Sequence, residues 1–400
     1  MIARVRAYSS FEDAVEEWHR FGIETFVDDS LEMSGTIFVF VEGDSDMMLN
    51  VLRDTVGTLG GIASRCDSFN TKRLMISGGP ALFRKLSKHA PVPAANLVAW
   101  ALENYYSPET TSLEIPSGPL SFARTRVMGV LNVTPDSFSD GGAFVKKEDA
   151  VKRAFEIADQ GADIIDIGGE STRPFSEPVS QEVEMNRVLP VLEEVVPSLC
   201  IPISIDTTKP SVARKAVELG AQIINDVSGL RDQKMIDTVA ELDVPVVLMH
   251  MRGNPKIMQV DVKYDEVVGD IMHYMAEQMG KAVEGGVKEE KIMLDPGIGF
   301  GKELRHNLEI IRRLREFRSL GRPIVIGPSR KGFIGKVLDL PKEERLEGSL
   351  AAVAASVING ANIVRVHDVK ETVRVCRMLD AVRLGKDPLL HESSCEVNLE

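Results

Sequence analysis

The stretch MGVLNVTPDSFSDGG, residues 128–142, decides the fold of this chain. It begins as an apolar strand that ends at Asn132, and a turn-rich segment with Pro135, two aspartates, three hydroxyl side chains and a pair of glycines follows. A buried strand that runs into a polar, glycine-rich loop is how parallel α/β proteins present ligand-binding groups. Seven further apolar runs come later in the chain, each followed by a helical pattern.

The alternation of these runs predicts an α/β fold built from eight strand–helix units. Strands are expected over residues 127–133, 163–169, 202–206, 223–227, 244–250, 292–296, 323–328 and 362–367. Helices are expected over 147–160, 180–196, 210–220, 233–242, 264–286, 306–318, 345–359 and 369–383. Eight units over ~260 residues match a TIM (β/α)8 barrel. Polar residues end nearly every strand, which favours the barrel over an open doubly wound sheet, the rival fold.

The first 110 residues carry a different pattern, which predicts a small α+β domain of its own. The runs ARVRAYS, TIFVFVEG and KRLMISGG are strand-like, and helices are expected near 11–21, 44–57 and 92–104. We expect this domain, of unknown role, over 1–110, the barrel over 111–387 and a disordered tail over 388–400. The segment 108–122 is either a linker or a hairpin that closes the barrel floor.

Composition limits the classes of partner. A net charge of −13 argues against a nucleic-acid surface or an anionic-membrane anchor. Four cysteines without CxxC spacing favour reduced thiols, and no apolar run is long enough for a membrane span. We expect a soluble cytoplasmic protein that acts on small-molecule substrates. The expected oligomeric state, a homodimer, does not follow from composition.

Ligands of a barrel bind at the carboxyl ends of its strands. The polar groups at those ends are Asn132, the loop 168–174, Asp206, Asn225 with Asp226, His250, Asp295, the run 327–332, and Arg365 with His367. The acidic and amide groups among them suit a flat heterocycle with an amino-lactam edge. The basic groups suit a polyphosphate. The sequence contains no HExxH or GxxxxGK[ST] motif, so we expect catalysis by positioning and electrostatics.

Each of these residues also has a purely structural interpretation. An aspartate at a strand end is often a helix N-cap, and Asp166, inside a strand, suits a buried polar network. His250 is either a core histidine or a ligand, while His273 and His306 are expected on the surface. The glycines of 297–301 do not have the register of a dinucleotide site. What favours a binding site is that so many polar groups recur together at strand ends.

At this point a family resemblance is clear. From about 111 to 385 the chain resembles the dihydropteroate synthases, which are pterin-binding barrels. The resemblance is carried, in family order, by MGVLNVTPDSFSDGG, GADIIDIGGESTRP, ISIDTTKP, IINDVSG, VVLMHMRGNP, DPGIGFGK, PSRKGFIG and IVRVHDVKET. It implies condensation of 6-hydroxymethyl-7,8-dihydropterin diphosphate with p-aminobenzoate by an SN1-like substitution.

The resemblance also implies roles for individual residues. Those placed around the pterin are Asp206, Asn225, Met249, Asp295 and Lys331. Those placed at the diphosphate are Asn132, Arg365 and His367, with Asn132 also contacting a Mg²⁺ ion. Those placed at the arylamine are Phe138, Ser171, Thr172, Arg173, Pro174 and Arg330. The residues implied to be catalytic are Asp206, Lys331, Arg365 and His367.

One departure from the family pattern is Gly332, where the family has Ser or Arg after the SRK triplet. The missing side chain either leaves room for a larger arylamine, such as a ribosylated one, or leaves space that water fills. Two rival functions share the barrel. They are a methyltetrahydrofolate corrinoid methyltransferase, which needs no diphosphate-binding group, and a non-catalytic pterin-binding protein, which should lack a catalytic residue.

Overall fold

The computed structural model of this chain describes residues 1–8, 14, 36–67, 72–89, 93–107, 111–134, 147–171, 176–253, 258 and 262–387. Over these residues the chain forms two compact units. Unit 1 comprises 1–109, 264–273 and 315–321, and unit 2 comprises the remainder. The predicted helix near 11–21 and the predicted disordered tail lie outside the described residues.

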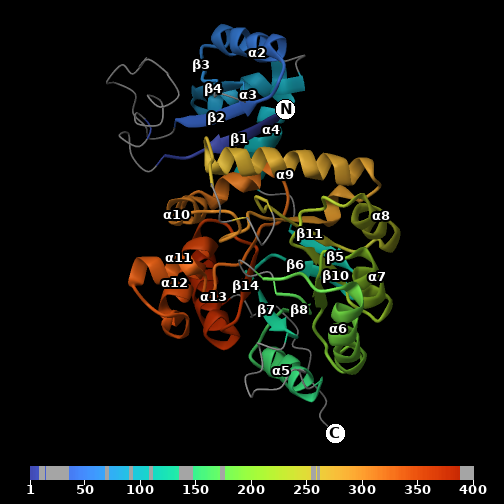
Figure 1. Ribbon diagram of the computed structural model, residues 1–400. Helices are drawn as coiled ribbons and strands as arrows, with labels where there is room; N and C mark the ends of the chain where they lie inside the picture. The colour runs from blue at the N-terminus through green and yellow to red at the C-terminus, as the bar shows by residue number, and fades with distance from the viewer. Residues whose placement is uncertain are drawn as a thin grey trace. The chain divides into compact units, whose positions relative to one another are not determined.

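Unit 2 is the predicted (β/α)8 barrel (Figure 1). Its parallel strands are β7 (Arg126–Asn132), β8 (Ile164–Gly168), β9 (Ile203–Asp206), β10 (Ile223–Asp226), β11 (Val246–Met249), β12 (Ile292–Asp295), β13 (Val325–Ile326) and β14 (Ile363–Val366). They pair in the order β12-β11-β10-β9-β8-β7-β14-β13. A parallel bridge between Leu294 and Ile324 joins the two ends of this sheet, so the barrel closes and the rival open sheet is wrong.

The helices follow the strands as predicted, with two differences. They are α5 (Lys147–Asp159), α6 (Gln181–Val195), α7 (Pro210–Glu218), α8 (Gln233–Leu242), α9 (Val267–Glu284), α10 (Leu304–Arg312), α12 (Leu346–Ile358) and α13 (Val369–Leu384). The predicted helix over 306–318 is divided, because α10 ends and a 3-10 helix, η3 (Leu314–Leu320), follows. The sequence analysis missed α11 (Gly332–Leu338), whose two glycines weaken the helical pattern.

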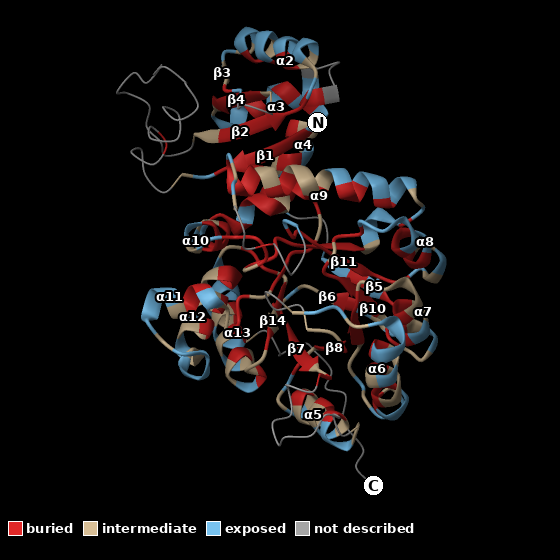
Figure 2. Ribbon diagram, viewed as in Figure 1, coloured by how far each residue is buried: buried red, intermediate tan, exposed pale blue. Residues whose placement is uncertain are grey.

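Side chains inside the barrel form an apolar layer below a polar one. Met128, Ile164, Val247 and Met293 pack together near the amino ends of the strands. The segment 108–122 contains a hairpin, β5 (Ser112–Ile115) and β6 (Gly118–Ser121), whose leucines join this cluster. The second of the two predicted alternatives is therefore confirmed. Side chains alternate along a strand, so the inward-pointing residue two positions further on lies nearer the carboxyl end of the strand. The polar layer lies at these second inward positions. Figure 2 shows the strands almost wholly buried.

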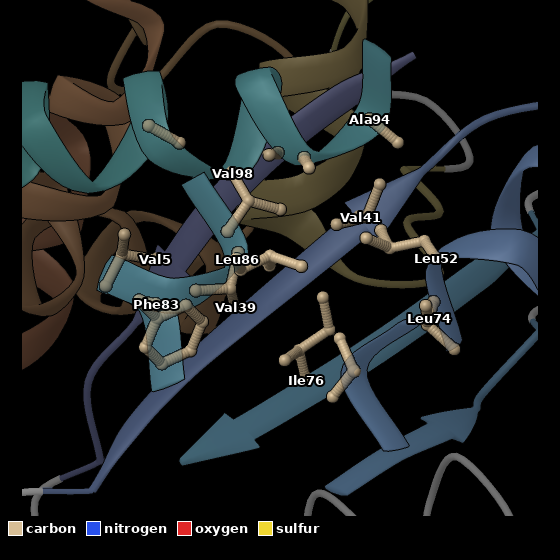
Figure 3. Packing of buried hydrophobic residues seen from close by; sticks show 14 of the residues in the cluster. Val5, Val39, Val41, Leu52, Leu74, Ile76, Phe83, Leu86, Ala94 and Val98 are labelled. Atoms are coloured by element: carbon tan, nitrogen blue, oxygen red, sulfur yellow. The ribbon is translucent and has the colours of Figure 1, made fainter. Parts of the chain in front are cut away.

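Unit 1 contains a four-stranded antiparallel sheet in the order β1-β2-β4-β3. The strands are β1 (Ile2–Arg6), β2 (Ile37–Glu42), β3 (Ile62–Arg65) and β4 (Arg73–Gly78), and the helices are α2 (Asp46–Thr58), α3 (Pro80–His89) and α4 (Pro93–Tyr106). Figure 3 shows the core between them, where Val39, Val41, Leu74 and Ile76 of the sheet meet Leu86 and other helix residues. The sequence analysis missed β3 and α3.

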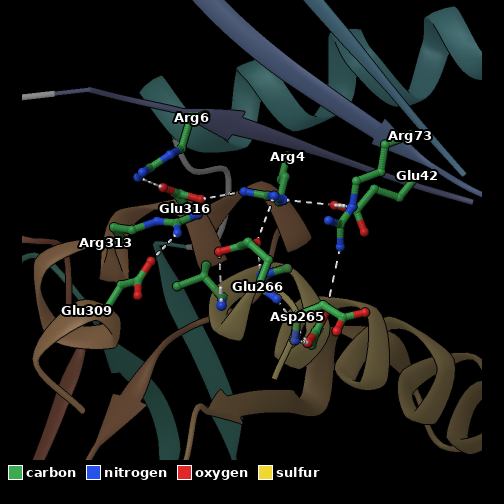
Figure 4. Close-up of polar contacts among 12 residues, drawn as sticks. Arg4, Arg6, Glu42, Arg73, Asp265, Glu266, Glu309, Arg313 and Glu316 are labelled. Carbon is green, nitrogen blue, oxygen red and sulfur yellow. Dashed lines mark hydrogen bonds and ion pairs between the residues drawn. The ribbon is translucent and has the colours of Figure 1, made fainter. Parts of the chain in front are cut away.

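A buried ionic network explains why unit 1 includes residues that were assigned to the barrel (Figure 4). The fully buried guanidinium of Arg4 donates to Glu42 at 3.1 Å, to Glu266 at 2.9 Å and to Glu316 at 2.9 Å. The network joins β1 and β2 to the segments 264–273 and 315–321. Residues far apart in sequence therefore share one folding unit, which a boundary at residue 110 does not capture.

No helix among the residues that the structure describes is long and apolar enough to cross a membrane.

Candidate active site

A cavity of about 660 Å³ opens at the carboxyl ends of the barrel strands. Its lining includes ten predicted residues, which are Asn132, Ser171, Asp206, Asn225, Met249, Asp295, Arg330, Lys331, Arg365 and His367, together with Gly332. They come from all eight barrel strands or the turns that follow them. The prediction that distant polar side chains meet in one mouth is therefore confirmed for these residues.

Arg365 lies at the centre of the polar side of the cavity. Its Nε donates to Oδ2 of Asp166 and its Nη2 donates to Oδ2 of Asp206, each at 2.6 Å. Asn225 donates to the same oxygen of Asp166 at 3.0 Å. Although burial opposes it, the two carboxylates raise the pKa of Arg365 above its ordinary value. The guanidinium is therefore a permanent cation held between two strands.

The two acidic groups of the cavity are difficult to ionise. Burial raises the pKa of Asp206 to about 7, because the nearby charge of Arg365 only partly offsets the loss of water and the charge of Asp166. Burial also raises the pKa of Asp295, whose Oδ1 accepts the Gly297 backbone N–H at 2.7 Å. Perturbed carboxyl groups of this kind are characteristic of ligand-binding sites.

An apolar wall completes the cavity. Val227, Met249, Met258 and Phe300 pack against one another and line it. Lys331 lies over the Phe300 ring, with Nζ 4.3 Å from the ring centroid. Burial, with the charge of Arg365, lowers the pKa of Lys331 to about 8. A flat ring can lie against this apolar wall while its polar edge meets the carboxyl and amide groups.

His367 is neutral in this site. Burial, with Arg365 and Arg330 nearby, lowers the pKa of His367 to about 3. Its backbone N–H donates to Oγ of Ser329 at 3.2 Å, and its Nδ1 lies 3.1 Å from the same hydroxyl. If the hydroxyl donates to Nδ1, the proton of the neutral ring is on Nε2. We assign that tautomer, in which His367 is a hydrogen-bond donor and not a cation.

A tight turn and a buried lysine fix the loop after β12, which lines the cavity. A Cβ at Gly297, which has a φ of +70°, would lie 2.0 Å from the His250 carbonyl oxygen, so the glycine of this motif is required by the turn. Nζ of Lys302 lies 2.9 Å from Nδ1 of His250 and 3.0 Å from the Phe300 carbonyl oxygen. His250 is buried, which favours its interpretation as a core histidine.

Several predicted positions lie elsewhere or outside the described residues. Phe138, Thr172, Arg173 and Pro174 are among the residues that the structure does not describe. Arg330 lines the cavity, but its guanidinium donates to both carboxylate oxygens of Asp368. The expectation of a surface position for His306 is wrong, because this side chain is buried and caps α10 through the Glu303 N–H.

The sequence analysis assigned no role to several lining residues, among them Phe300, Lys302 and Ser329. Phe300 and Lys302 lie in the loop after β12, and Ser329 precedes Arg330 in a motif that was already singled out. Position after a strand was therefore a usable signal for all three. Their residue types gave none, because phenylalanine is usually core and lysine is usually exposed.

Comparison with known proteins agrees with this geometry. The family model for pterin binding enzymes matches residues 128–367. The dihydropteroate synthase of Escherichia coli (strain K12) is 46% identical over 273 residues, which cover 68% of this chain and 97% of the relative. That of Bacillus subtilis (strain 168) is 50% identical over 269 residues, covering 67% and 92%.

A solved structure gives the same result. Xanthomonas albilineans dihydropteroate synthase with 4-aminobenzoic acid superposes with a TM-score of 0.65 at 42% identity, covering 68% of this chain and 98% of that one. The chain is thus a pterin-binding barrel. It belongs to the dihydropteroate synthase family.

Proposed function

We propose that the protein condenses 6-hydroxymethyl-7,8-dihydropterin diphosphate with p-aminobenzoate, giving 7,8-dihydropteroate and diphosphate. The observation that carries the proposal is that one cavity combines an apolar wall, buried carboxyl groups and fixed cations. The apolar wall and the carboxyl groups suit a pterin ring, and the cations suit a diphosphate leaving group. Relatives that are 46% and 50% identical have this activity in their names.

In the proposed complex the pterin lies against Met249 and Phe300. Its amino-lactam edge donates to Asp206 and Asp295 and exchanges hydrogen bonds with Asn225. These groups are buried, so their hydrogen bonds to the ring face little competition from water. Carboxylates beside the ring also stabilise positive charge that develops on it. This role requires Asp206 to be ionised, which its raised pKa makes pH-dependent.

The diphosphate lies toward Asn132, Arg365 and His367, with Lys331 between it and the ring. The described residues contain no group of three His, Cys, Asp or Glu side chains that would hold a metal ion by themselves. Mg²⁺ commonly uses few protein ligands and completes its shell with phosphate oxygens and water. The amide oxygen of Asn132 fits that mode, and Mg²⁺ bound there supplies charge stabilisation for the departing diphosphate.

The reaction itself needs little from a general base. The bond between the pterin methylene carbon and the diphosphate oxygen breaks, and the electron-rich ring delocalises the resulting cation. The arylamine nitrogen, which is neutral near pH 7, donates its lone pair to form the new C–N bond. One amine proton is then lost to the diphosphate or to water. Positioning and electrostatics therefore supply most of the catalysis.

A product assay tests the proposal. The purified protein is given the pterin diphosphate with and without p-aminobenzoate, and dihydropteroate and diphosphate are both measured. We expect equal amounts of the two products and no diphosphate without the amine. Absence of dihydropteroate would contradict the proposal and favour one of the two rival functions.

A larger arylamine is a second candidate substrate, favoured by one observation. Gly332 lines the cavity, and a Cβ added there would meet no atom within 4 Å. Turnover of p-aminobenzoate and of a ribosylated arylamine, compared as kcat/KM, decides between them. We expect p-aminobenzoate to be preferred, and a higher kcat/KM for the larger amine would reverse this assignment.

The predicted homodimer and the predicted cytoplasmic location stay predictions. Sedimentation velocity of the purified chain tests the first, and fractionation of cells tests the second.

A further inference from the structure

The loop after β8 and the loop after β9 are joined by a lysine that the proposed mechanism does not use. Nζ of Lys209 donates to Glu184 at 2.6 Å and also donates to Glu170. Glu170 follows β8, Glu184 lies in the first turn of α6, and Lys209 is the residue before α7. One ammonium group therefore holds three segments that come from two neighbouring strand–helix units.

This contact is built into the fold. The side chain of Glu184 is fully buried, and Lys209 is mostly covered. Oε1 of Glu184 has no hydrogen-bond partner among the described residues, so the carboxylate depends on Lys209 for its compensating charge. The pairs with Glu170 and Glu184 raise the pKa of Lys209 although burial opposes it, so the ammonium is charged at any working pH.

Glu170 and Lys209 are both close in sequence to residues that line the cavity. Ser171, next to Glu170, lines the cavity, and Asp206 lies three residues before Lys209. The intervening backbone has little freedom, because Arg187 donates to the Gly169 carbonyl oxygen at 2.7 Å and the Lys209 N–H donates to Oγ1 of Thr207 at 3.2 Å. Pairing of Gly168 in β8 with Asp206 in β9 sets the spacing of the two strands up to their ends, and Lys209 ties Glu170, the residue before Ser171, to the start of α7 just beyond them.

We propose that Lys209 is a positioning residue that fixes the Ser171 loop relative to Asp206, and so sets the affinity for the arylamine. This inference rests on the proposed function, which places the pterin against Asp206, and on the family resemblance, which places the arylamine beside Ser171. The pterin contacts of Asp206, Asn225 and Asp295 do not involve Glu170. Loss of the Glu170 contact should therefore affect one substrate and spare the other.

Two variants test the proposal in the full-length protein. Glu170→Ala removes the loop contact and leaves the buried pair of Lys209 and Glu184 intact, so folding is preserved. Lys209→Met removes both contacts, and Lys209→Arg restores a cation. The matched controls are Glu218→Ala and Lys215→Met, which break an exposed ion pair on α7.

The expected result is a split between the two substrates. In Glu170→Ala the KM for p-aminobenzoate should rise at least about fivefold, while the KM for the pterin diphosphate stays within about twofold. Lys209→Met should show the same split, Lys209→Arg should reverse most of it, and both controls should behave as wild type. Equal changes in both KM values, or none in Glu170→Ala, would overturn the proposal.

Hydrogen exchange tests independently of enzyme activity whether the Glu170 contact holds the segment with Ser171 in place. A peptide containing Glu170 and Ser171 should exchange faster in Glu170→Ala than in wild type or Glu218→Ala. Unchanged exchange would also overturn the proposal. If the wild-type protein makes no dihydropteroate but this peptide responds as expected, the proposed function fails and the positioning role of the cluster stands.

Discussion

Arg365 donates a 2.6 Å hydrogen bond to Asp206. Arg365 lies in β14 and Asp206 in β9, and strands β7 and β8 separate them in the sheet. The main cation of the site is thus paired with an acidic group that also faces the cavity. A substrate that carries both a hydrogen-bonding ring and a diphosphate gives each of them a new partner. The ion pair therefore organises both groups before the substrate binds, and lowers the cost of burying each charge.

The first prediction concerns Asp206. Asp206→Ala removes an acceptor for the pterin edge and leaves Arg365 paired with Asp166 alone. We expect pterin affinity to fall by about 1.5–3 kcal/mol, as for a lost hydrogen bond to a charged group. Titration calorimetry with the pterin diphosphate measures this directly.

An Asp232→Ala variant serves as the control for Asp206→Ala, because Asp232 is an exposed N-cap of α8. Its pterin affinity should equal that of wild type. Wild-type affinity in Asp206→Ala would remove this residue from the pterin site.

The second prediction concerns pH. Asp206 must be ionised to accept hydrogen bonds, and its pKa is raised to about 7, so kcat/KM for the pterin diphosphate should fall as pH drops below about 7. Asp166→Asn removes a negative charge that raises the pKa of Asp206 and leaves Arg365 to pair with Asp206. The fall of kcat/KM on the acid side of the pH–rate profile, its acid limb, should therefore move to lower pH in this variant, by about one unit.

A pH–rate profile of wild type and Asp166→Asn measures this shift. Asp232→Asn, on the exposed end of α8, is the matched control and should leave the acid limb in place. A limb that stays at the same pH in Asp166→Asn would show that Asp206 does not control it.

Local sequence patterns predict the strands of the barrel, but they do not predict which side chains meet in the folded chain. The strands of the barrel were predicted to within two residues at each end, because runs buried on both faces are apolar throughout. Polar residues at strand ends could be assigned to one mouth, since parallel strands all point there. Asp166 could not be placed in contact with Arg365, because its partner is 199 residues away.

In unit 1 the tertiary contacts of charged side chains could not be predicted from the sequence. Its strand Ile2–Arg6 was predicted, but the partners of Arg4 could not be, because arginines in an edge strand are usually exposed. Glu266 and Glu316 were assigned to barrel helices, where acidic residues normally face solvent. Only the folded chain shows that all three side chains are buried together.

The third prediction concerns the metal ion. If Mg²⁺ bridges Asn132 and the diphosphate, removal of divalent ions with a chelator should lower kcat/KM for the pterin diphosphate, and added Mg²⁺ should restore it. The thermal midpoint of the ligand-free protein should not change, since one amide is the only protein ligand proposed. Full activity in chelator would contradict the assignment of Mg²⁺.

The fourth prediction concerns the stability of unit 1. Arg4→Met keeps the length of the side chain and removes the cation from a cluster in which Glu42, Glu266 and Glu316 are buried. Breaking a buried ion pair from one side costs about 3–5 kcal/mol. Arg73 and Arg6 still pair with Glu42 and Glu316 in the variant, but the buried carboxylates lose the cation that all three share. Hydrogen exchange of peptides from β1 and β2 should therefore become much faster.

Arg53→Met is the matched control for Arg4→Met, because it breaks an exposed pair with Asp54. Such pairs contribute no more than about 1 kcal/mol, so exchange in β1 and β2 should stay close to wild type. Peptides from α5 and α6, which lie in unit 2, report whether the effect is local. If Arg4→Met exchanges no faster than Arg53→Met in β1 and β2, the network does not hold unit 1 together and its stability must come from the apolar core alone.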